Sequence, residues 1–384
     1  MTAWSEPAAA GRVFKYGLAW LARIGRHLHR FLLEALRLRW RLAQAGRKLL
    51  GRKRTTYLDD RVDEYRAYWE EASKKLGATF EPICAGAWEI RRGAQRTRIA
   101  NYMVQIDDPV ILRLAGNKPY CCAVASRLGI PVAPHRSFRL GEIDAAWSFM
   151  VARGGAFVVK PASGSGGAIG VTMHVRTRRK LENAAALASL YSGELMVESM
   201  LPAESCRLLY LDGKLIHAVR RRGLRVVGDG RSSIRELLAR DGFERLHSDK
   251  ATLDTLKVQR LSLASRIAAK REVVARYLPP AEQLTEELRT VYNESITALV
   301  CPQLAQALAR VVGEVGSRLA GVDVLTNDPS VPLAESGGVF LELNTTPGLH
   351  HHYVDPQQPT VAARVLRYLL EENRDEQRRD RLFA

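Results

Sequence analysis

Two apolar runs near the C-terminus, joined by a segment rich in proline and glycine, constrain the fold of this chain most strongly. The runs Val322–Thr326 and Val339–Asn344 have a strand–loop–strand pattern. Successive strand residues point to opposite faces, so Glu342 and Asn344 share a face, and Asp323 can join them from the neighbouring strand. Two carboxylates and an amide oxygen suit Mg²⁺ that also holds phosphates. The polar face of an exposed hairpin would show the same pattern, and this stretch alone does not separate the two interpretations.

A glycine-rich stretch, FVVKPASGSGGAIGVTMHV at Phe157–Val175, is the second informative feature. It has the pattern of two strands around a tight loop, with Lys160 at the end of the first strand. Glycines let backbone N–H groups approach a polyphosphate closely, and the lysine adds positive charge. The stretch is neither a P-loop nor a dinucleotide fingerprint, because a strand follows it rather than a helix. A purely structural turn is the alternative, and the oxygen-rich cluster further along the chain favours nucleotide binding.

Several motifs in a fixed order carry a resemblance to a known superfamily. They are KPxSGSGG at 160–167, VE at 197–198, RR at 220–221, GDGRSSIREL at 228–237, GVDV at 321–324 and ELNTTPG at 342–348. Together they resemble the ATP-grasp carboxylate–amine ligases, above all the ATP-grasp region of cyanophycin synthetase and its glutathione-forming relatives. The resemblance covers roughly residues 110–370.

The resemblance implies an α+β fold of the ATP-grasp type, in which two α+β lobes grip ATP. It divides the chain into four predicted parts. Residues 1–54 form a basic amphipathic helical extension, and residues 55–112 form a small N-terminal cap. Residues 113–200 form the N-lobe, and residues 201–384 form the C-lobe with the metal site and a C-terminal helix.

The resemblance also implies roles for individual residues. The triphosphate ligands would be Lys118, Lys160, Ser163, Gly164, Ser165, Gly166 and Gly167. The adenosine contacts would come from Glu198, Met200, Glu204 and Arg207. Relatives often place an acid seven positions after the residue that matches Glu198, where this chain has Ser205, so Glu204 stands one position early.

Two further sets complete the implied site. Arg220 or Arg221 would stabilise the negative charge of the transferring phosphoryl group. Asp323, Glu342 and Asn344 would bind one or two Mg²⁺ ions. The implied reaction is ATP-dependent amide bond formation through an acyl phosphate, with release of ADP and phosphate. The competing hypothesis is a non-catalytic ATP-binding module, which docks on a membrane or partner through its N-terminal helix.

The substrates are not identified by the sequence. Amino acids, a peptide terminus and a side-chain carboxylate all remain candidates, and a homo-oligomer remains open. Residues 241–300 depart most from cyanophycin synthetase, and within them Asn293 is a weak candidate for the substrate site. The triplet His350–His352 follows the metal strand, and we interpret it as a loop near the substrate site, with at least two of its histidines exposed to solvent.

Charge is concentrated at the N-terminus. The chain of 384 residues has a net charge of +17, and residues 11–54 contain 13 of its 58 Lys and Arg but only one acid, Glu34. Apolar residues in this segment recur at helical spacing, so we predict a basic amphipathic helix over residues 11–50. It could lie on an anionic membrane surface or an acidic partner, or pack on its own body or on a second subunit. Specific nucleic-acid binding is not indicated, because no reading motif is present.

The compartment follows from cysteine use and hydropathy. Five cysteines without a C-x-x-C pair predict neither a disulfide framework nor a zinc site, and they fit a reducing cytoplasm. No apolar run is long enough to cross a membrane, and arginines interrupt any signal-peptide core. We therefore expect a cytoplasmic protein, with attachment to the inner face of the membrane as an open possibility.

Local patterns predict several further elements. Phe80–Ile90 has the pattern of one strand, and Asp212–Gly213 is typical of a two-residue β-hairpin turn. Ser233 and Glu236 form a capping box that opens a helix. Pro302–Leu319 has helical periodicity and leads into the metal strand.

Overall fold

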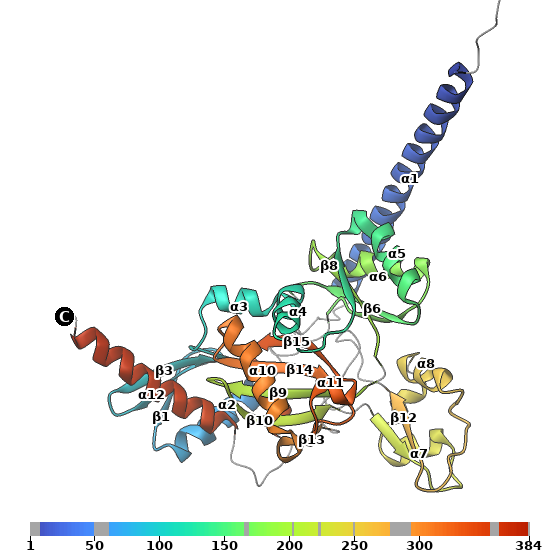
Figure 1. Cartoon of the computed structure of the whole chain (residues 1–384). Helices are drawn as coiled ribbons and strands as arrows, with labels where there is room; N and C mark the ends of the chain where they lie inside the picture. The colour runs from blue at the N-terminus through green and yellow to red at the C-terminus, as the bar shows by residue number, and fades with distance from the viewer. Residues whose placement is uncertain are drawn as a thin grey trace, which may run out of the picture. The chain divides into compact units, whose positions relative to one another are not determined.

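The computed structural model describes residues 8–49, 61–164, 169–201, 203–221, 224–248, 250–276, 293–353 and 361–382. The chain forms two compact units, and each is built from segments that are separate in sequence. Unit 1 comprises residues 1–54, 135–161 and 170–199, and unit 2 comprises residues 55–134, 162–169 and 200–384. Helices and antiparallel sheets occur in both units, which confirms the predicted α+β class (Figure 1).

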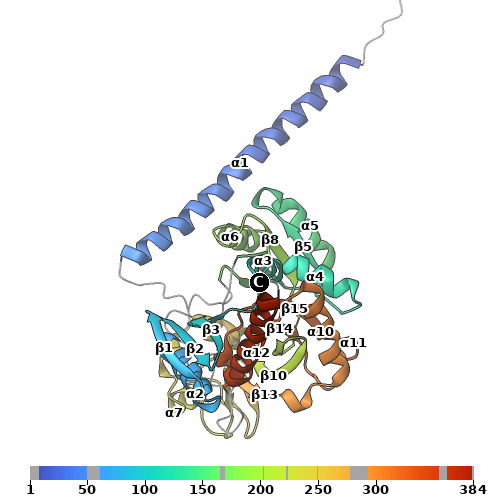
Figure 2. The ribbon, with the colours of Figure 1, turned by 90° about the vertical axis from the view of Figure 1, so that its left-hand side faces the viewer.

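Unit 1 is built on a four-stranded antiparallel sheet in the order β5-β8-β6-β7. These strands are β5 (His135–Phe138), β8 (Leu195–Ser199), β6 (Phe157–Pro161) and β7 (Thr172–Val175). The helices of the unit are η2 (Leu140–Glu142), α5 (Ile143–Arg153), α6 (Arg178–Ala188) and the long α1 (Ala8–Leu49). Side chains from the sheet, α5 and α6 bury one another in a single core that includes Phe157, Leu181 and Leu195. The predicted N-terminal helix is thus present, as one continuous element (Figure 2).

One face of α1 packs on unit 1. Leu33 is 2% exposed and belongs to the core of the unit. Beyond it, Gln44 Nε2 donates to the Tyr191 hydroxyl at 2.7 Å, and Arg39 Nη2 donates to Asn183 Oδ1 at 3.2 Å. Packing on its own body, one of the alternatives for this segment, therefore accounts for one face of the helix. In the part of the chain that the structure describes, no helix is long and apolar enough to span a membrane.

Unit 2 contains a five-stranded antiparallel sheet in the order β13-β10-β9-β14-β15. The strands are β13 (Asn293–Ser295), β10 (Lys214–Arg221), β9 (Ser205–Leu211), β14 (Leu319–Leu325) and β15 (Val339–Thr345). The elements associated with them are α3 (Pro109–Ala115), α4 (Lys118–Arg127), η4 (Thr297–Leu299), α10 (Pro302–Val315), α11 (Leu333–Ser336) and η5 (Leu349–His352). The predicted hairpin between β9 and β10 is confirmed, because Asp212 and Gly213 both have positive φ, as its tight turn requires.

The helix that leads to the metal strand is shorter than predicted. α10 ends at Val315, and Leu319 already belongs to β14. Gly316 adopts a left-handed conformation with φ of 84°, and its N–H bonds back to the last turn. A left-handed residue after the last helical turn stops the helix, and glycine adopts it without a steric penalty.

A second sheet of unit 2 carries the N-terminal cap segment, in the order β1-β2-β3-β4. Its strands are β1 (Thr79–Cys84), β2 (Ala87–Arg92), β3 (Gln95–Ala100) and β4 (Met103–Val104), and they pack with α2 (Val62–Lys75) and α12 (Val361–Leu382). The prediction of one strand over Phe80–Ile90 is wrong. A hairpin replaces it, because Gly86, with φ of 74°, turns the chain between β1 and β2.

A third group of elements in unit 2 has a core of its own. It contains β11 (Leu224–Val227), β12 (Glu272–Arg276), α7 (Ile234–Arg240), η3 (Glu244–Ser248) and α8 (Lys250–Val258). The predicted capping box is confirmed, since Ser233 and Glu236 each accept a backbone N–H of the other. Residues 277–292 of the segment that departs from cyanophycin synthetase lie outside the described residues.

Candidate active site

The register of the five-stranded sheet brings the three predicted metal ligands together. Asp323 on β14 pairs with Glu342 on β15, and Asn344 lies two residues further along the same strand. Directly paired residues point to the same face of a sheet. Asn344 Nδ2 lies 3.3 Å from Asp323 Oδ2 and 3.4 Å from Glu342 Oε1. The predicted oxygen cluster therefore exists as one local group.

Arg207 neutralises the most buried member of this cluster. It pairs with Asp323 from β9, and its Nε and Nη2 donate to the two carboxylate oxygens at 2.7 and 2.6 Å. Asp323 is 2% exposed and Arg207 is 7% exposed. A buried carboxylate needs such a partner, and the two-pronged guanidinium fixes its orientation as well. The structure thus places Arg207, predicted as an adenosine contact, against the predicted metal ligand.

Lys118 reaches the cluster from a different element. Asn117 caps the N-terminus of α4, and the Lys118 N–H donates to the carbonyl of Ala162 at 2.9 Å. From this anchored position Lys118 Nζ lies 3.7 Å from Glu342 Oε2. Two carboxylates thus stand beside the cations Lys118, Arg207 and Arg221, an excess of positive charge that suits a polyphosphate.

The two arginines at the end of β10 point to opposite faces of the sheet. Arg221 Nη1 lies 3.6 Å from Asp323 Oδ2, so Arg221 shares the face of the oxygen cluster. Arg220 instead lies 3.4 Å from Glu204 and 3.8 Å from Glu294. Adjacent strand residues alternate in this way, and the register therefore distinguishes the two predicted catalytic arginines.

Glu204, the predicted ribose contact, is engaged by arginines. Arg225 lies 2.5 Å from one of its carboxylate oxygens, and Arg220 approaches the other. Its backbone is fixed too, because Thr326 N–H donates to its carbonyl at 2.9 Å.

The glycine-rich hairpin of unit 1 contains a buried ion pair. Lys160 on β6 donates from Nζ to Glu198 Oε1 on β8 at 2.7 Å, and both residues are 4% exposed. Met200 follows β8 and is half-buried, and Ser163 and Gly164 lie just beyond β6. The predicted phosphate ligands Ser165, Gly166 and Gly167 lie outside the described residues.

The donor set suits Mg²⁺ by its chemistry. Hard cations of this size are held by one or two carboxylates, while water and phosphate oxygens complete the shell. Asp323 and Glu342 supply the carboxylates, and a half-turn of the Asn344 amide would exchange Nδ2 for Oδ1 toward them. Within the described residues, no group of three or more His, Cys, Asp and Glu side chains is placed to hold a metal. The cluster of Asp323, Glu342 and Asn344 combines two acids with an amide, so it is not a group of that composition.

Cysteine chemistry is absent from this region. Burial raises the pKa of the Cys121 thiol to about 12, and burial raises that of Cys206 to about 11. Both thiols are therefore protonated at neutral pH, and a protonated thiol is a poor nucleophile.

The histidine triplet was predicted wrongly. His350, His351 and His352 are between 2% and 4% exposed, whereas at least two were expected to face solvent. Leu349 is fully buried and pulls the η5 turn into the core, and the His350 ring Nδ1 lies 2.9 Å from the Tyr65 hydroxyl. The Tyr65 hydroxyl thus takes the place of water at the His350 ring. No local sequence pattern indicates this burial, because Tyr65 is 285 residues away along the chain.

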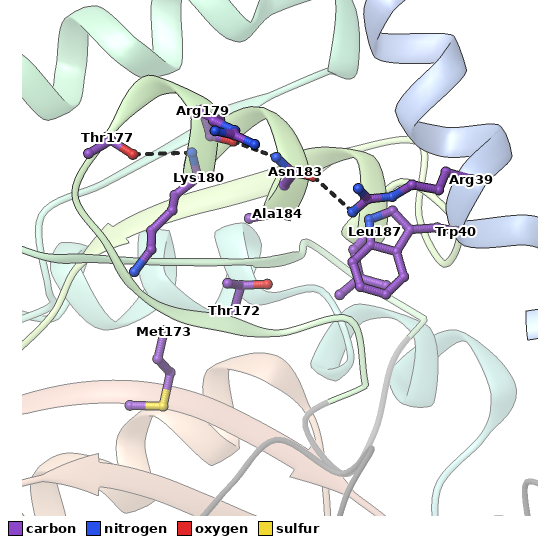
Figure 3. Close-up of a pocket in the computed structure, with 10 residues that line it drawn as sticks. All are labelled: Arg39, Trp40, Thr172, Met173, Thr177, Arg179, Lys180, Asn183, Ala184 and Leu187. Atoms are coloured by element: carbon purple, nitrogen blue, oxygen red, sulfur yellow. Dashed lines mark hydrogen bonds between the residues drawn. The ribbon is translucent and has the colours of Figure 1, made fainter. Parts of the chain in front are cut away.

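A groove in unit 1 is a separate feature. It has a volume of about 430 Å³ and is formed by residues of α1, α6 and the region of β7 (Figure 3). Arg39 and Trp40 of α1 form one side, and Lys180 and Asn183 of α6 form another. Of the predicted ATP and metal ligands that the structure describes, none lines this groove.

Comparisons with known proteins agree with the fold and the motifs. No protein-family model matches the chain. Cyanophycin synthetase of Trichormus variabilis is 26% identical over 331 residues, which cover 80% of this chain and 36% of that protein. The glutathione biosynthesis bifunctional protein GshAB of Enterococcus faecalis is 24% identical over 277 residues, which cover 69% of this chain and 35% of that protein. The chain thus spans about a third of the length of these relatives.

A solved structure shows the same fold. The bifunctional glutathione synthetase from Pasteurella multocida superimposes with a TM-score of 0.51 at 21% identity, covering 78% of this chain and 44% of that one. The shared fold, together with the two sequence relatives, confirms the predicted α+β class of ATP-grasp type. The chain therefore has the fold of the ATP-grasp ligases and is similar in sequence to cyanophycin synthetase and GshAB.

Proposed function

We propose that this chain is an ATP-dependent carboxylate–amine ligase that forms an amide bond through an acyl phosphate. The observation that supports it most is the cluster of Asp323, Glu342 and Asn344 with Lys118 beside it. Such a donor set suits a metal–phosphate complex and supports the roles that the motif resemblance implies for these residues. The similar cyanophycin synthetase and glutathione-forming proteins support a small-molecule or peptide substrate.

The proposed reaction has two steps. The carboxylate of the acid attacks the γ-phosphorus of ATP, which gives an acyl phosphate and ADP. The amine then attacks the acyl carbon, and phosphate leaves as the amide forms. Neither step uses a side-chain nucleophile, in agreement with the protonated thiols of Cys121 and Cys206. The protein contributes positioning and charge stabilisation, as in other phosphoryl transfers.

Individual residues would contribute as follows. Asp323, Glu342 and Asn344 would hold one or two Mg²⁺, which neutralise phosphate charge. Lys118 would bind phosphate oxygens next to them, and Arg221 would stabilise the charge that develops on the acyl phosphate. Lys160, Ser163 and Gly164 are proposed as further phosphate ligands on the strength of the motif resemblance, and Glu198 and Met200 as adenosine contacts.

A matched pair of variants tests the ligase. Glu342→Gln keeps the shape of the side chain and removes its charge, so we expect at least a roughly 100-fold loss of ADP release. Glu335→Gln makes the same change at an exposed position of α11 that contacts none of the proposed ligands in the described hydrogen bonds and ion pairs, and it should retain wild-type turnover. The measurement is ADP and phosphate release with Mg·ATP against a matrix of carboxylic acids and amines. ATP binding without turnover for every pair would favour the non-catalytic module.

We also propose that the outer face of α1 docks on an anionic membrane surface. Leu28, Phe31, Leu38 and Leu42 are 69%, 74%, 55% and 63% exposed there. They are spaced by three, seven and four residues, which keeps them on one side of the helix, and Arg30 and Arg41 are exposed on the same helix. An apolar stripe on a strongly basic helix has the composition that binds the headgroup region of anionic lipid. Such binding would make the protein a peripheral one on the cytoplasmic face.

Vesicle flotation tests this docking in the full chain. Vesicles of phosphatidylcholine with phosphatidylserine should carry the wild type upward, and vesicles of phosphatidylcholine alone should carry less. The double variant Phe31→Ser/Leu38→Ser should lose most of the floated fraction. Val151→Ser, which changes an apolar side chain 62% exposed on α5 of the same unit, is the matched control. Equal flotation of the double variant and the wild type would exclude this face as the lipid contact.

A further inference from the structure

The buried imidazoles of unit 2 form a chain of polar contacts. His352 Nδ1 lies 3.0 Å from His217 Nδ1, and His217 Nε2 lies 3.3 Å from Ser295 Oγ. His217 and His352 are each 4% exposed, and Ser295 is half-buried at the edge strand β13. These contacts thus lead from a buried ring nitrogen of His352 to the Ser295 side chain, which solvent reaches.

The contact series His352–His217–Ser295 lies on the face of the sheet that carries the oxygen cluster. Arg221 pairs with Asn293, and Val219 pairs with Ser295, so Asn293 and Ser295 face the same way as Arg221. The charges of Arg207 and Arg221 both act on His352. Both arginines also contact Asp323, so the imidazoles lie beside the groups proposed to hold the reacting phosphate.

His352 Nε2, at the inner end of these contacts, has no hydrogen-bond partner among the described residues. Within the described residues, no group lies within hydrogen-bond distance of His352 Nε2 or of Asn293 Oδ1, although both atoms are buried. Asn293 Nδ2 donates to the His351 carbonyl at 3.3 Å, which leaves Oδ1 as an acceptor. Burying a polar atom without a partner costs free energy, so such atoms mark a place where a ligand completes the bonding.

The Nδ1–Nδ1 contact restricts the protonation states of the pair. One Nδ1 must carry a proton and the other must be bare, because two neutral imidazoles cannot both donate there. Burial, with the nearby arginine charges, holds the pKa of His352 well below its usual value, so the ring is neutral at pH 7. When His352 holds its proton on Nδ1, its Nε2 is a bare acceptor. An amine N–H is the group that such an acceptor takes.

We propose that His352 accepts the proton of the attacking amine through Nε2, and that His217 and Ser295 carry the charge on to solvent. This inference rests on the proposed ligase function and assigns the amine subsite of that same centre. Asn293 Oδ1 would accept a second amine hydrogen and orient the nitrogen lone pair. His352 is the catalytic group, and His217 and Ser295 act through it.

The step balances without a charged imidazole. The amine nitrogen bonds to the acyl carbon, the carbon–oxygen bond to phosphate breaks, and phosphate leaves as its anion. One amine proton moves to His352 Nε2 while the His352 Nδ1 proton moves to His217 Nδ1. The His217 Nε2 proton moves to Ser295 Oγ, and the serine proton passes to water. Each ring ends neutral in its other tautomer, which agrees with a site where the imidazolium form is disfavoured.

A comparison of two nucleophiles distinguishes proton transfer by His352 from a purely structural role of this residue. Both nucleophiles lose an N–H proton as they attack the acyl carbon. The alkylamine nitrogen is weakly acidic and needs a base to take that proton, whereas the more acidic hydroxylamine nitrogen gives its proton to water and forms a hydroxamate without the histidine. With the acid found in the substrate screen, His352→Gln should reduce amide formation roughly 100-fold. The same variant should form hydroxamate within about twofold of wild type. His217→Gln should shift the same ratio in the same direction.

His350→Gln is the matched control, because it alters a buried ring of the same turn whose partner is Tyr65. It should change both products by the same factor. Equal losses of amide and hydroxamate in His352→Gln would reduce the role of His352 to packing and overturn the relay. Unchanged amide formation would overturn it as well. Failure of the ligase proposal is a different result, in which the wild type itself gives neither hydroxamate nor ADP with any acid.

Discussion

At the scale of single residues, burial determines how much an ion pair contributes to the free energy of unfolding. Arg207–Asp323 and Arg127–Glu314 have the same shortest distance, 2.6 Å. The side chains of the first pair are 9% and 3% exposed, and those of the second are 62% and 49% exposed. Water screens the exposed pair and solvates either partner if the other is lost. The buried aspartate has no such substitute.

These two pairs lead to a direct prediction for stability. Arg207→Leu removes the two-pronged partner of the buried Asp323 and leaves Arg221, 3.6 Å away, as a cation beside it. We expect this variant to lower the free energy of unfolding by about 3 kcal/mol. Arg127→Leu should change it by about 1 kcal/mol at most. Urea denaturation followed by circular dichroism measures both. Similar losses in the two variants would show that burial does not set the contribution of these ion pairs.

At the scale of elements, sequence patterns predicted the structure correctly where the interacting residues are neighbours in sequence. The capping box at Ser233 and the turn at Asp212–Gly213 involve only neighbours in sequence, and both are confirmed. Both errors in element boundaries lie at glycines with positive φ, Gly86 and Gly316. Hydrophobic periodicity continues through such positions, because it reports which side is buried and carries no information about the backbone turn.

Two glycines of one helix test this explanation. In Gly316→Ala the left-handed backbone is strained, and the new Cβ meets the Ile111 side chain at 3.0 Å. We expect a loss of about 1–2 kcal/mol in the free energy of unfolding. Gly313 lies inside α10 with nothing within 4 Å of a new Cβ, so Gly313→Ala should gain about 0.5–1 kcal/mol. Thermal denaturation of the two variants should therefore shift in opposite directions.

At the scale of the whole molecule, the sequence predicted which residues share a face of the sheet better than it predicted their contacts with distant segments. Strand alternation placed Asp323, Glu342 and Asn344 on one face, and the register agrees. The Arg207 contact to Asp323 and the burial of the histidines depend on pairings between distant segments. No periodicity encodes those pairings. The amphipathic pattern of residues 11–50 likewise showed a helix with an apolar stripe, but not that α6 covers part of it.

The way each unit draws on separate segments affects synthesis on the ribosome. Every segment of unit 1 lies within the first 199 residues, so its parts have emerged before the sheet that holds Asp323 and Glu342 exists. The cap segment is made early, yet Trp69 and Ile90 share their core with Val361 and Leu366 of the last helix. Those apolar side chains must stay uncovered until α12 has been made. A nascent chain of this protein therefore exposes the cap segment for a long interval, and that segment is where a chaperone would bind.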